Sequence, residues 1–206
     1  MIGIHDPVVV VTDLGLALLG GYFAWRLWRG PGAILMAGLA SAAFWGAVFH
    51  GFFPAGTATR SGFVVWLAVA FSILVVACAL LNLAITLLGA RLTAGAGRAI
   101  TTVYCLTSIA VVLFVDESFA TIVWLYAPVL MLALAAAAFE AARSHSPAWG
   151  LIALGLALSA LAALAQRASV VLHATYFDHN AVYHLIQAAA LVVLYAGFVR
   201  RVSDAR

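Results

Sequence analysis

Seven long apolar stretches, separated by short polar turns, constrain the fold of this chain more than any other feature of its sequence. They lie at about residues 8–28, 32–54, 62–89, 99–115, 119–142, 148–172 and 177–199. A helix of roughly 20 apolar residues crosses a hydrocarbon layer of about 30 Å. Only 8% of the residues are charged, against about 25% in soluble globular proteins. The sequence therefore predicts an all-α, polytopic membrane protein, with residues 1–206 forming a single seven-helix transmembrane domain.

The distribution of arginine predicts how the chain is oriented. All ten basic residues are arginines, and eight of them fall at the ends of stretches on one side of the predicted bundle. Arg60 lies alone on the other side, and Arg167 lies inside the sixth stretch. The positive-inside rule then places the N-terminus outside and the C-terminus in the cytoplasm. We expect a multi-pass protein of a bacterial inner (plasma) membrane.

The same distribution limits the partners and cofactors of the chain. The arginines are scattered singly and form no basic patch, which argues against a nucleic-acid partner and leaves membrane lipids as the expected one. The chain has no lysine, so it cannot form the Schiff base that retinal requires. Its oligomeric state is not indicated by any sequence pattern.

The most unusual stretch is FDHNAVYHLIQ (177–187), because it carries five polar side chains into a predicted membrane helix. Each polar group at that depth costs several kcal/mol unless it has a partner. Asn180, His184 and Gln187 are spaced i, i+4, i+7 and share one helix face. His179 can join His184 only if the chain is still unwound at that point. The stretch thus predicts a polar site whose partners come from other helices.

Candidate partners gather in the outer half of the predicted bundle. With a rise of about 1.5 Å per residue, His50 lies about 6 Å and His184 roughly 10 Å below the outer ends of their stretches. The candidates at this level or at the rim above it are Asp13, His50, Asp116, Arg167, His173, His179 and His184. Imidazoles and carboxylates at one level suit a divalent metal, and Zn²⁺ with a water in an open position fits best. The alternative is that the histidines close helix ends by hydrogen bonding and that Arg167 pairs with Asp13.

A Phe-His pair at the end of the second stretch (Phe49-His50) and the histidine-bearing start of the seventh resemble the CREST superfamily. That superfamily includes alkaline ceramidases, progestin/adipoQ receptors and haemolysin III-like proteins. The resemblance implies a zinc ion held by one histidine on helix two and an H-x-x-x-H pair on helix seven, with a nearby serine and aspartate. It also implies hydrolysis of a lipid amide. In this sequence Asn180 stands at the first histidine of the pair, and Gly46 stands at the serine.

The first functional hypothesis is a zinc-dependent intramembrane hydrolase that acts on a lipid amide or ester from the outer leaflet. The resemblance implies His50 and His184 as zinc ligands, with His179 or His173 supplying the third nitrogen. The lipid substrate would enter sideways from the membrane. This hypothesis makes membrane lipids both the surroundings and the substrate of the protein.

Three further residues have expected roles in that hydrolase. Asp13 or Asp116 would orient the water or a ligand imidazole, and Arg167 would hold an anionic headgroup or the oxyanion. The second hypothesis is a non-enzymatic seven-helix sensor or accessory protein, in which Asn180 and Gly46 mark a lost catalytic set. A small transporter has weaker support, because the stretches become apolar toward the inner side.

Overall fold

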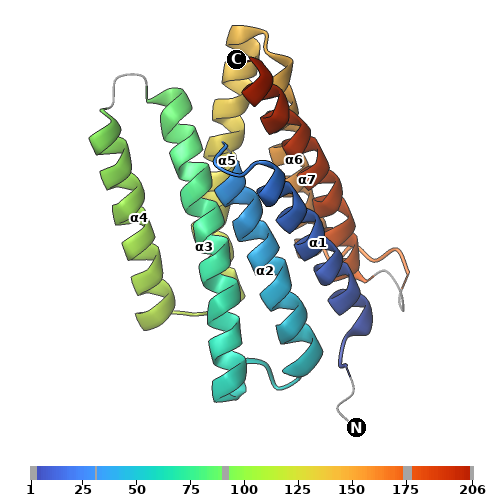
Figure 1. Cartoon of the computed structure of the whole chain (residues 1–206). Helices are drawn as coiled ribbons and strands as arrows, with labels where there is room; N and C mark the ends of the chain where they lie inside the picture. The colour runs from blue at the N-terminus through green and yellow to red at the C-terminus, as the bar shows by residue number, and fades with distance from the viewer. Residues whose placement is uncertain (1–3, 31, 90–92, 174–177, 205–206) are drawn as a thin grey trace.

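The chain folds into a bundle of long helices, shown in Figure 1. The computed structural model describes residues 4–30, 32–89, 93–173 and 178–204. Its elements are α1 (Pro7–Arg26), α2 (Ala33–Phe52), the short 3₁₀ turn η1 (Gly56–Ala58), α3 (Arg60–Leu88), α4 (Ala94–Phe114), α5 (Phe119–Ser144), α6 (Pro147–Arg167) and α7 (His179–Asp204). Each of the seven α-helices is long and apolar enough to cross a membrane. The predicted all-α, multi-pass membrane class is confirmed.

Polar residues at the turns decide where several helices begin. Thr59, Thr93 and Ser118 precede α3, α4 and α5, and the hydroxyl of each accepts a hydrogen bond from a backbone N–H three residues later. Such bonds satisfy donors that the first helical turn leaves without a partner. Pro7 and Pro147 begin α1 and α6, where the missing N–H of proline has no cost. Local chemistry in the turns therefore fixes most of the helix starts.

Two helix boundaries differ from the predicted ones in ways that affect the site. α6 ends at Arg167, before the predicted end at residue 172, and Ser169 just beyond it has a φ of 53°. α7 is helical from His179 and continues to Asp204, beyond the predicted end at residue 199. Hydropathy located both apolar stretches correctly. It could not show at which residues the turn between them ends α6 and begins α7.

Six of the helices form a closed ring, and the seventh lies outside it. The order around the ring is α1, α2, α3, α5, α6 and α7, and α7 closes the ring by packing on α1. α4 packs mainly against α3 at the edge of the bundle (Figure 1). Large side chains such as Met36, Leu80, Ile152 and Leu194 fill the ring and are almost fully buried. α7 is therefore held between α6 and α1, and its polar residues face those two helices.

Two glycines fix how closely α7 approaches α6. A Cβ atom added to Gly155 on α6 would lie 2.5 Å from Cγ of Leu194 on α7. A Cβ atom added to Gly197 on α7 would lie 2.7 Å from Cγ1 of Ile152 on α6. Small residues at such contacts let membrane helices pack closely. The two contacts set the rotation of α7 about its axis, and with it the directions of its polar side chains.

Candidate functional site

A buried cluster of three polar side chains joins α1 to α7. Nε2 of His184 lies 3.1 Å from Oδ1 of Asp13, and Nδ1 of His184 lies 2.7 Å from the hydroxyl oxygen of Thr12. Asp13 is 4% exposed and His184 is 7% exposed. Both ring nitrogens of His184 are thus engaged by neighbouring residues of α1. We call Thr12, Asp13 and His184 the Asp13–His184 cluster.

The hydroxyl of Thr12 allows this cluster to exist with a neutral or a charged imidazole. Its oxygen also lies 3.1 Å from the carbonyl oxygen of Val8 and 3.0 Å from that of Val9. The hydroxyl carries a single proton and further acceptor capacity. It donates to Nδ1 when the ring is neutral, and it donates to a carbonyl and accepts from Nδ1 when the ring is charged. Nε2–H faces Asp13 in both states, so the proton changes the strength of this contact and not its donor.

The carboxylate of Asp13 also faces α2, at Gly46. A Cβ atom added to Gly46 would lie 3.2 Å from Oδ2 of Asp13, so the glycine leaves room for the carboxylate. Oδ2 is buried and has no hydrogen-bond partner among the residues that the structure describes. Oδ2 of Asp13 is therefore an acceptor without a donor among the described residues, at the point where α1, α2 and α7 meet.

The other two polar residues on the same face of α7 turn to α6. Oδ1 of Asn180 accepts a hydrogen bond from Nε2 of Gln166 at 2.9 Å. Nε2 of Gln187 donates to the hydroxyl oxygen of Ser159 at 3.2 Å. The face predicted for Asn180, His184 and Gln187 therefore lies over the boundary between two helices. Asn180 and Gln187 contact α6, whereas His184 contacts α1.

His50 lies in a different place from His184. His50 lines a hollow of about 180 Å³ at the end of the bundle where α1 begins, together with His5 and Asp6, and we call it the rim hollow. Nδ1 of His5 lies 3.2 Å from Oδ2 of Asp6 in the same hollow. His50 is on the face of α2 that carries Gly46, one helical turn nearer the end of that helix. The structure thus places His50 at the rim and His184 in the buried cluster below it.

The remaining predicted residues near α6 and α7 are not brought into the cluster. α7 is already helical at His179, so the ring of His179 lies about 140° around the helix from His184. The unwinding that would let His179 join His184 is therefore not found. His173 is exposed in the segment before α7, and Arg167 is exposed at the end of α6. The ionic partner of Asp13 is His184 and not Arg167.

Asp116 lies in the turn between α4 and α5 and stabilises the start of α5. Its carboxylate accepts hydrogen bonds from the hydroxyl of Thr121 and from the hydroxyl and backbone N–H of Ser118, the latter two at 2.7 and 3.0 Å. The bond from Thr121, followed by those from Ser118, holds the pKa of Asp116 below its ordinary value. Its partners belong to its own turn, so the structure gives Asp116 a capping role apart from the cluster.

The arrangement of donors does not fit the zinc site that the resemblance implies. Among the described residues, no three or more His, Cys, Asp or Glu side chains come together as a metal-binding group. Thr12 and Asp13 engage both ring nitrogens of His184, and His50 lines the rim hollow. We therefore assign no step of any reaction to a metal here.

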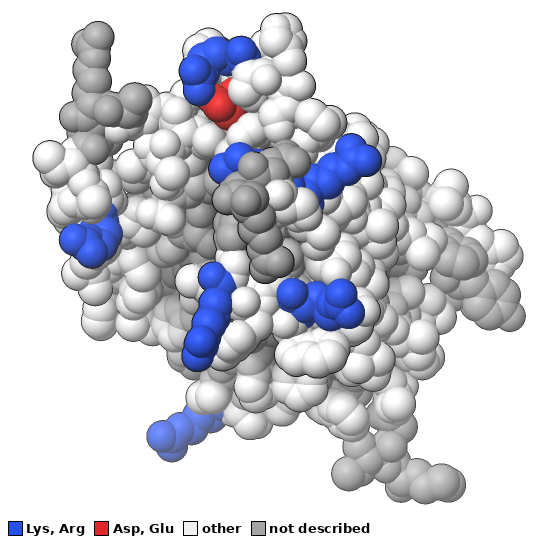
Figure 2. All heavy atoms as spheres, turned by 45° about the horizontal axis from the view of Figure 1, so that its top comes forward, with Lys and Arg blue, Asp and Glu red and all other residues white. Residues whose placement is uncertain are grey.

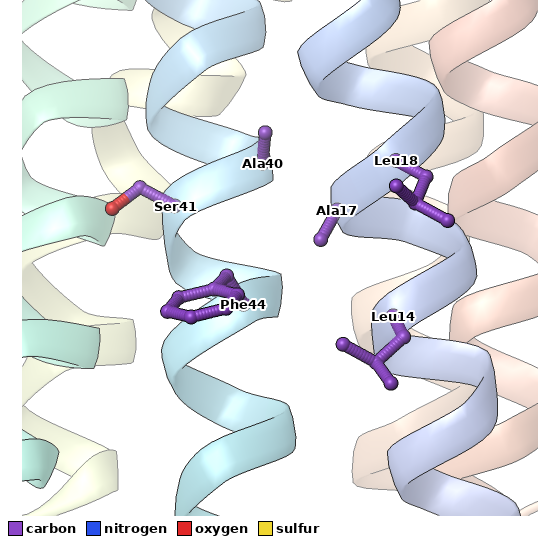
Figure 3. A pocket seen from close by; sticks show the side chains of 6 residues that line it. All are labelled: Leu14, Ala17, Leu18, Ala40, Ser41 and Phe44. Carbon is purple, nitrogen blue, oxygen red and sulfur yellow. The ribbon is translucent and has the colours of Figure 1, made fainter.

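A second hollow on the surface lies away from this chemistry. It has a volume of about 480 Å³ and runs between α1 and α2, as Figure 3 shows. It is lined by Leu14, Ala17, Leu18, Ala40, Ser41 and Phe44. The hydroxyl of Ser41 points away from the hollow toward α3 and lies 2.8 Å from that of Ser72. The hollow is an apolar groove on the side of the bundle, without a titratable group.

Sequence reasoning missed two members of these polar contacts, Thr12 and Ser159. A signal for Ser159 is present, because Ser159 and Gln166 are seven residues apart on α6, as are Asn180 and Gln187 on α7. Two antiparallel helices with the same spacing of polar residues can pair both at once. For Thr12 we find no signal beyond its position next to Asp13.

Comparison with known proteins places the chain in a family. No curated protein and no solved structure matches it significantly. One family model does match, and the match covers residues 8–203, which is nearly the whole chain. The chain therefore belongs to DUF6962, a family of unknown function.

Proposed function

We propose that this chain is a non-enzymatic membrane sensor, in which a proton on the Asp13–His184 cluster is the signal. One observation carries the proposal. The face of α7 that a hydrolase would use to hold zinc is occupied by contacts between helices, with His184 bonded to α1 and Asn180 bonded to α6. These contacts favour a role in sensing a proton over a role in hydrolysis.

Because the cluster is buried, gaining or losing one proton there should change the free energy of the contact between α1 and α7 substantially. A charged imidazole beside the Asp13 carboxylate makes a pair with no net charge. Loss of one proton leaves a net negative charge in an apolar layer, where uncompensated charge is costly. Histidine is the side chain whose ordinary titration falls near neutral pH. Protonation of His184 thus favours close contact between α7 and α1, and deprotonation weakens it.

Few other titratable groups face the cluster from the surrounding helices. Tyr183 on α7 lies within electrostatic range of Asp13, and Tyr126 on α5 lies within range of Tyr183. α2 presents Gly46 to the carboxylate. His184 is the imidazole in direct contact with Asp13, so it is the group to test.

The test measures the distance between α1 and α7 as a function of pH. Spin labels would be attached through Val11→Cys and Leu185→Cys, at exposed positions on the two helices, after Cys78→Ala and Cys105→Ala. In nanodiscs, the distance distribution should change between about pH 5 and pH 8. His184→Gln should abolish the change, because glutamine keeps a donor for Asp13 but does not titrate.

The matched control is His145→Gln, which removes a histidine at the exposed turn between α5 and α6. This variant should respond to pH like the labelled parent. A pH-independent distance in the parent, or a change that persists in His184→Gln, would contradict the proposal.

The zinc-dependent lipid hydrolase of the CREST type stays a prediction, and one contact favours it. The hydrogen bond that Nε2 of His184 donates to Asp13 is the kind of carboxylate–imidazole contact that orients metal ligands, the role expected for Asp13, and Nδ1 would bind zinc in place of Thr12. Protein prepared without metal-affinity resin should then contain about one zinc per chain, and His184→Ala should remove it. A zinc content below about a tenth of an equivalent, unchanged by the substitution, would rule this function out.

A further inference from the structure

The end of the bundle where the α1–α2 turn meets the end of α7 carries a group of arginines. Arg26 and Arg29 come from the end of α1 and the turn after it, and Arg200 and Arg201 come from α7. Figure 2 shows basic side chains gathered over this end of the molecule. Arg26, Arg29 and Arg200 are exposed. We call these four residues the arginine end.

Close packing of the turn against α7 keeps the two pairs of arginines at one end. The backbone of Arg29 is left-handed, with a φ of 63°, and Gly32 has a φ of 90°. A Cβ atom added to Gly32 would lie 2.5 Å from Cδ2 of Phe198 on α7, and one added to Gly30 would lie 3.8 Å from Cγ2 of Val202. The turn is thus seated directly on α7, and its basic side chains share a surface with Arg200.

None of the four arginines makes an ion pair with a carboxylate whose side chain the structure describes. The arginine ion pair that the structure does describe lies elsewhere, on α5, where Arg143 and Glu140 are 2.9 Å apart. Arg201 lies over the ring of Trp149, with its guanidinium carbon 4.8 Å from the ring centroid. That contact holds Arg201 against α6 without removing its charge. Four arginines stand here against Asp204, the acid that follows them on α7, so the arginine end keeps an excess of positive charge.

Two exposed tryptophans place this charge at the level of lipid headgroups. Trp25 is 68% exposed and Trp28 is 74% exposed, and they alternate with Arg26 and Arg29 along the chain. Tryptophan is enriched where the hydrocarbon layer meets the headgroups. Guanidinium groups bind phosphate through paired hydrogen bonds, more specifically than ammonium groups. A ligand with a phosphate at this level and apolar tails beside α1 is an anionic phospholipid.

We infer that the arginine end is a binding site for the headgroup of an anionic phospholipid, held between the α1–α2 turn and the end of α7. This inference is independent of the proton-sensing function, because it uses neither Asp13 nor His184. Basic pockets between membrane helices recognise anionic headgroups in this way.

The experiment titrates the detergent-solubilised full chain with short-chain phosphatidylglycerol and follows tryptophan fluorescence, since Trp25 and Trp28 lie in the site. Short-chain phosphatidylcholine is the control ligand without net charge. The variant Arg29→Gln/Arg200→Gln removes one charge from each element and should weaken phosphatidylglycerol binding at least about tenfold. Arg60→Gln/Arg98→Gln removes the same charge from other helix ends and should change binding less than about twofold, because distant charges are screened.

The outcomes distinguish a specific headgroup-binding site from general electrostatic attraction between the protein and anionic lipid. Equal weakening in the two double variants, or equal binding of the two lipids by the parent chain, would overturn the site. Far-ultraviolet circular dichroism would check that the variants keep their helices. Should the double variant lose helix content, Arg200→Gln alone gives the answer, with an expected weakening of about fivefold against none for Arg98→Gln.

Discussion

α7 and α4 are both long apolar helices, but they occupy different environments. In an apolar window of 18 residues in each helix, 44% of the α7 window is buried inside the protein, against 17% of the α4 window. Asn180 and His184 on α7 bond to other helices, whereas the hydroxyl of Thr101 on α4 donates to Gly97 within its own helix. α4 also has one polar contact with the ring, because the hydroxyl of Tyr104 donates to the carbonyl oxygen of Leu125 on α5. What sets α7 apart is therefore its greater burial and the buried titratable pair that His184 makes with Asp13.

The largest effect should come from removing the imidazole on α7. His184→Ala leaves Asp13 buried without its ionic partner, which should lower the free energy of unfolding by about 3–5 kcal/mol. Unfolding in mixed micelles would measure the loss. Leu106→Ala on α4 is the control, because Leu106 is 62% exposed and should cost little. Similar losses in the two variants would mean that the cluster contributes no more than a lipid-facing side chain.

An intermediate effect should follow from a methyl group at the close contact between α6 and α7. Gly155→Ala places its Cβ 2.5 Å from Leu194, and overpacking of this kind costs about 1–3 kcal/mol. Gly95→Ala on α4 meets only the hydroxyl of Thr93, at 3.9 Å, and should be neutral or stabilising by up to about 1 kcal/mol. The same unfolding assay applies. A stable Gly155→Ala variant would show that the α6–α7 contact is looser than the structure indicates.

The smallest effect concerns Asp116, in the turn that connects α4 to the ring. Thr121→Val removes the strongest of the hydrogen bonds that lower the pKa of Asp116 from its ordinary value of 3.8, so this pKa should rise. A lowered pKa stabilises the fold above the ordinary value, and the contribution is lost as the pH falls through the folded-state pKa. In Thr121→Val the contribution should therefore be smaller and should be lost at a higher pH.

NMR titration of the Asp116 carboxyl carbon would measure this pKa directly. Thr101→Val on α4 is the control, because the hydroxyl of Thr101 bonds only within its helix and should leave the titration unchanged. An unchanged pKa in Thr121→Val would show that this bond contributes little in water.

Features that depend on neighbouring residues could be predicted from the sequence. Glu140 and Arg143 are three residues apart on one helix, a spacing at which side chains meet, and their nitrogen and oxygen atoms lie 2.9 Å apart. The partners of His184 could not be predicted, because depth alone made Arg167 and His50 as eligible as Asp13. The sequence also does not decide whether His179 can join His184, because hydropathy does not show the residue at which α7 begins.

The sequence by itself determined that the chain has seven helices long and apolar enough to cross a membrane, and that the last of them carries a polar face near its start. Both follow from local properties, namely the length of each apolar stretch and the spacing of polar residues along one helix. The tertiary structure decided that Asp13 meets His184, that Asn180 meets Gln166 and that α4 lies outside the ring. Those outcomes depend on how each helix is rotated and which neighbour it packs against. Contacts between small residues such as Gly155 and distant side chains set that rotation.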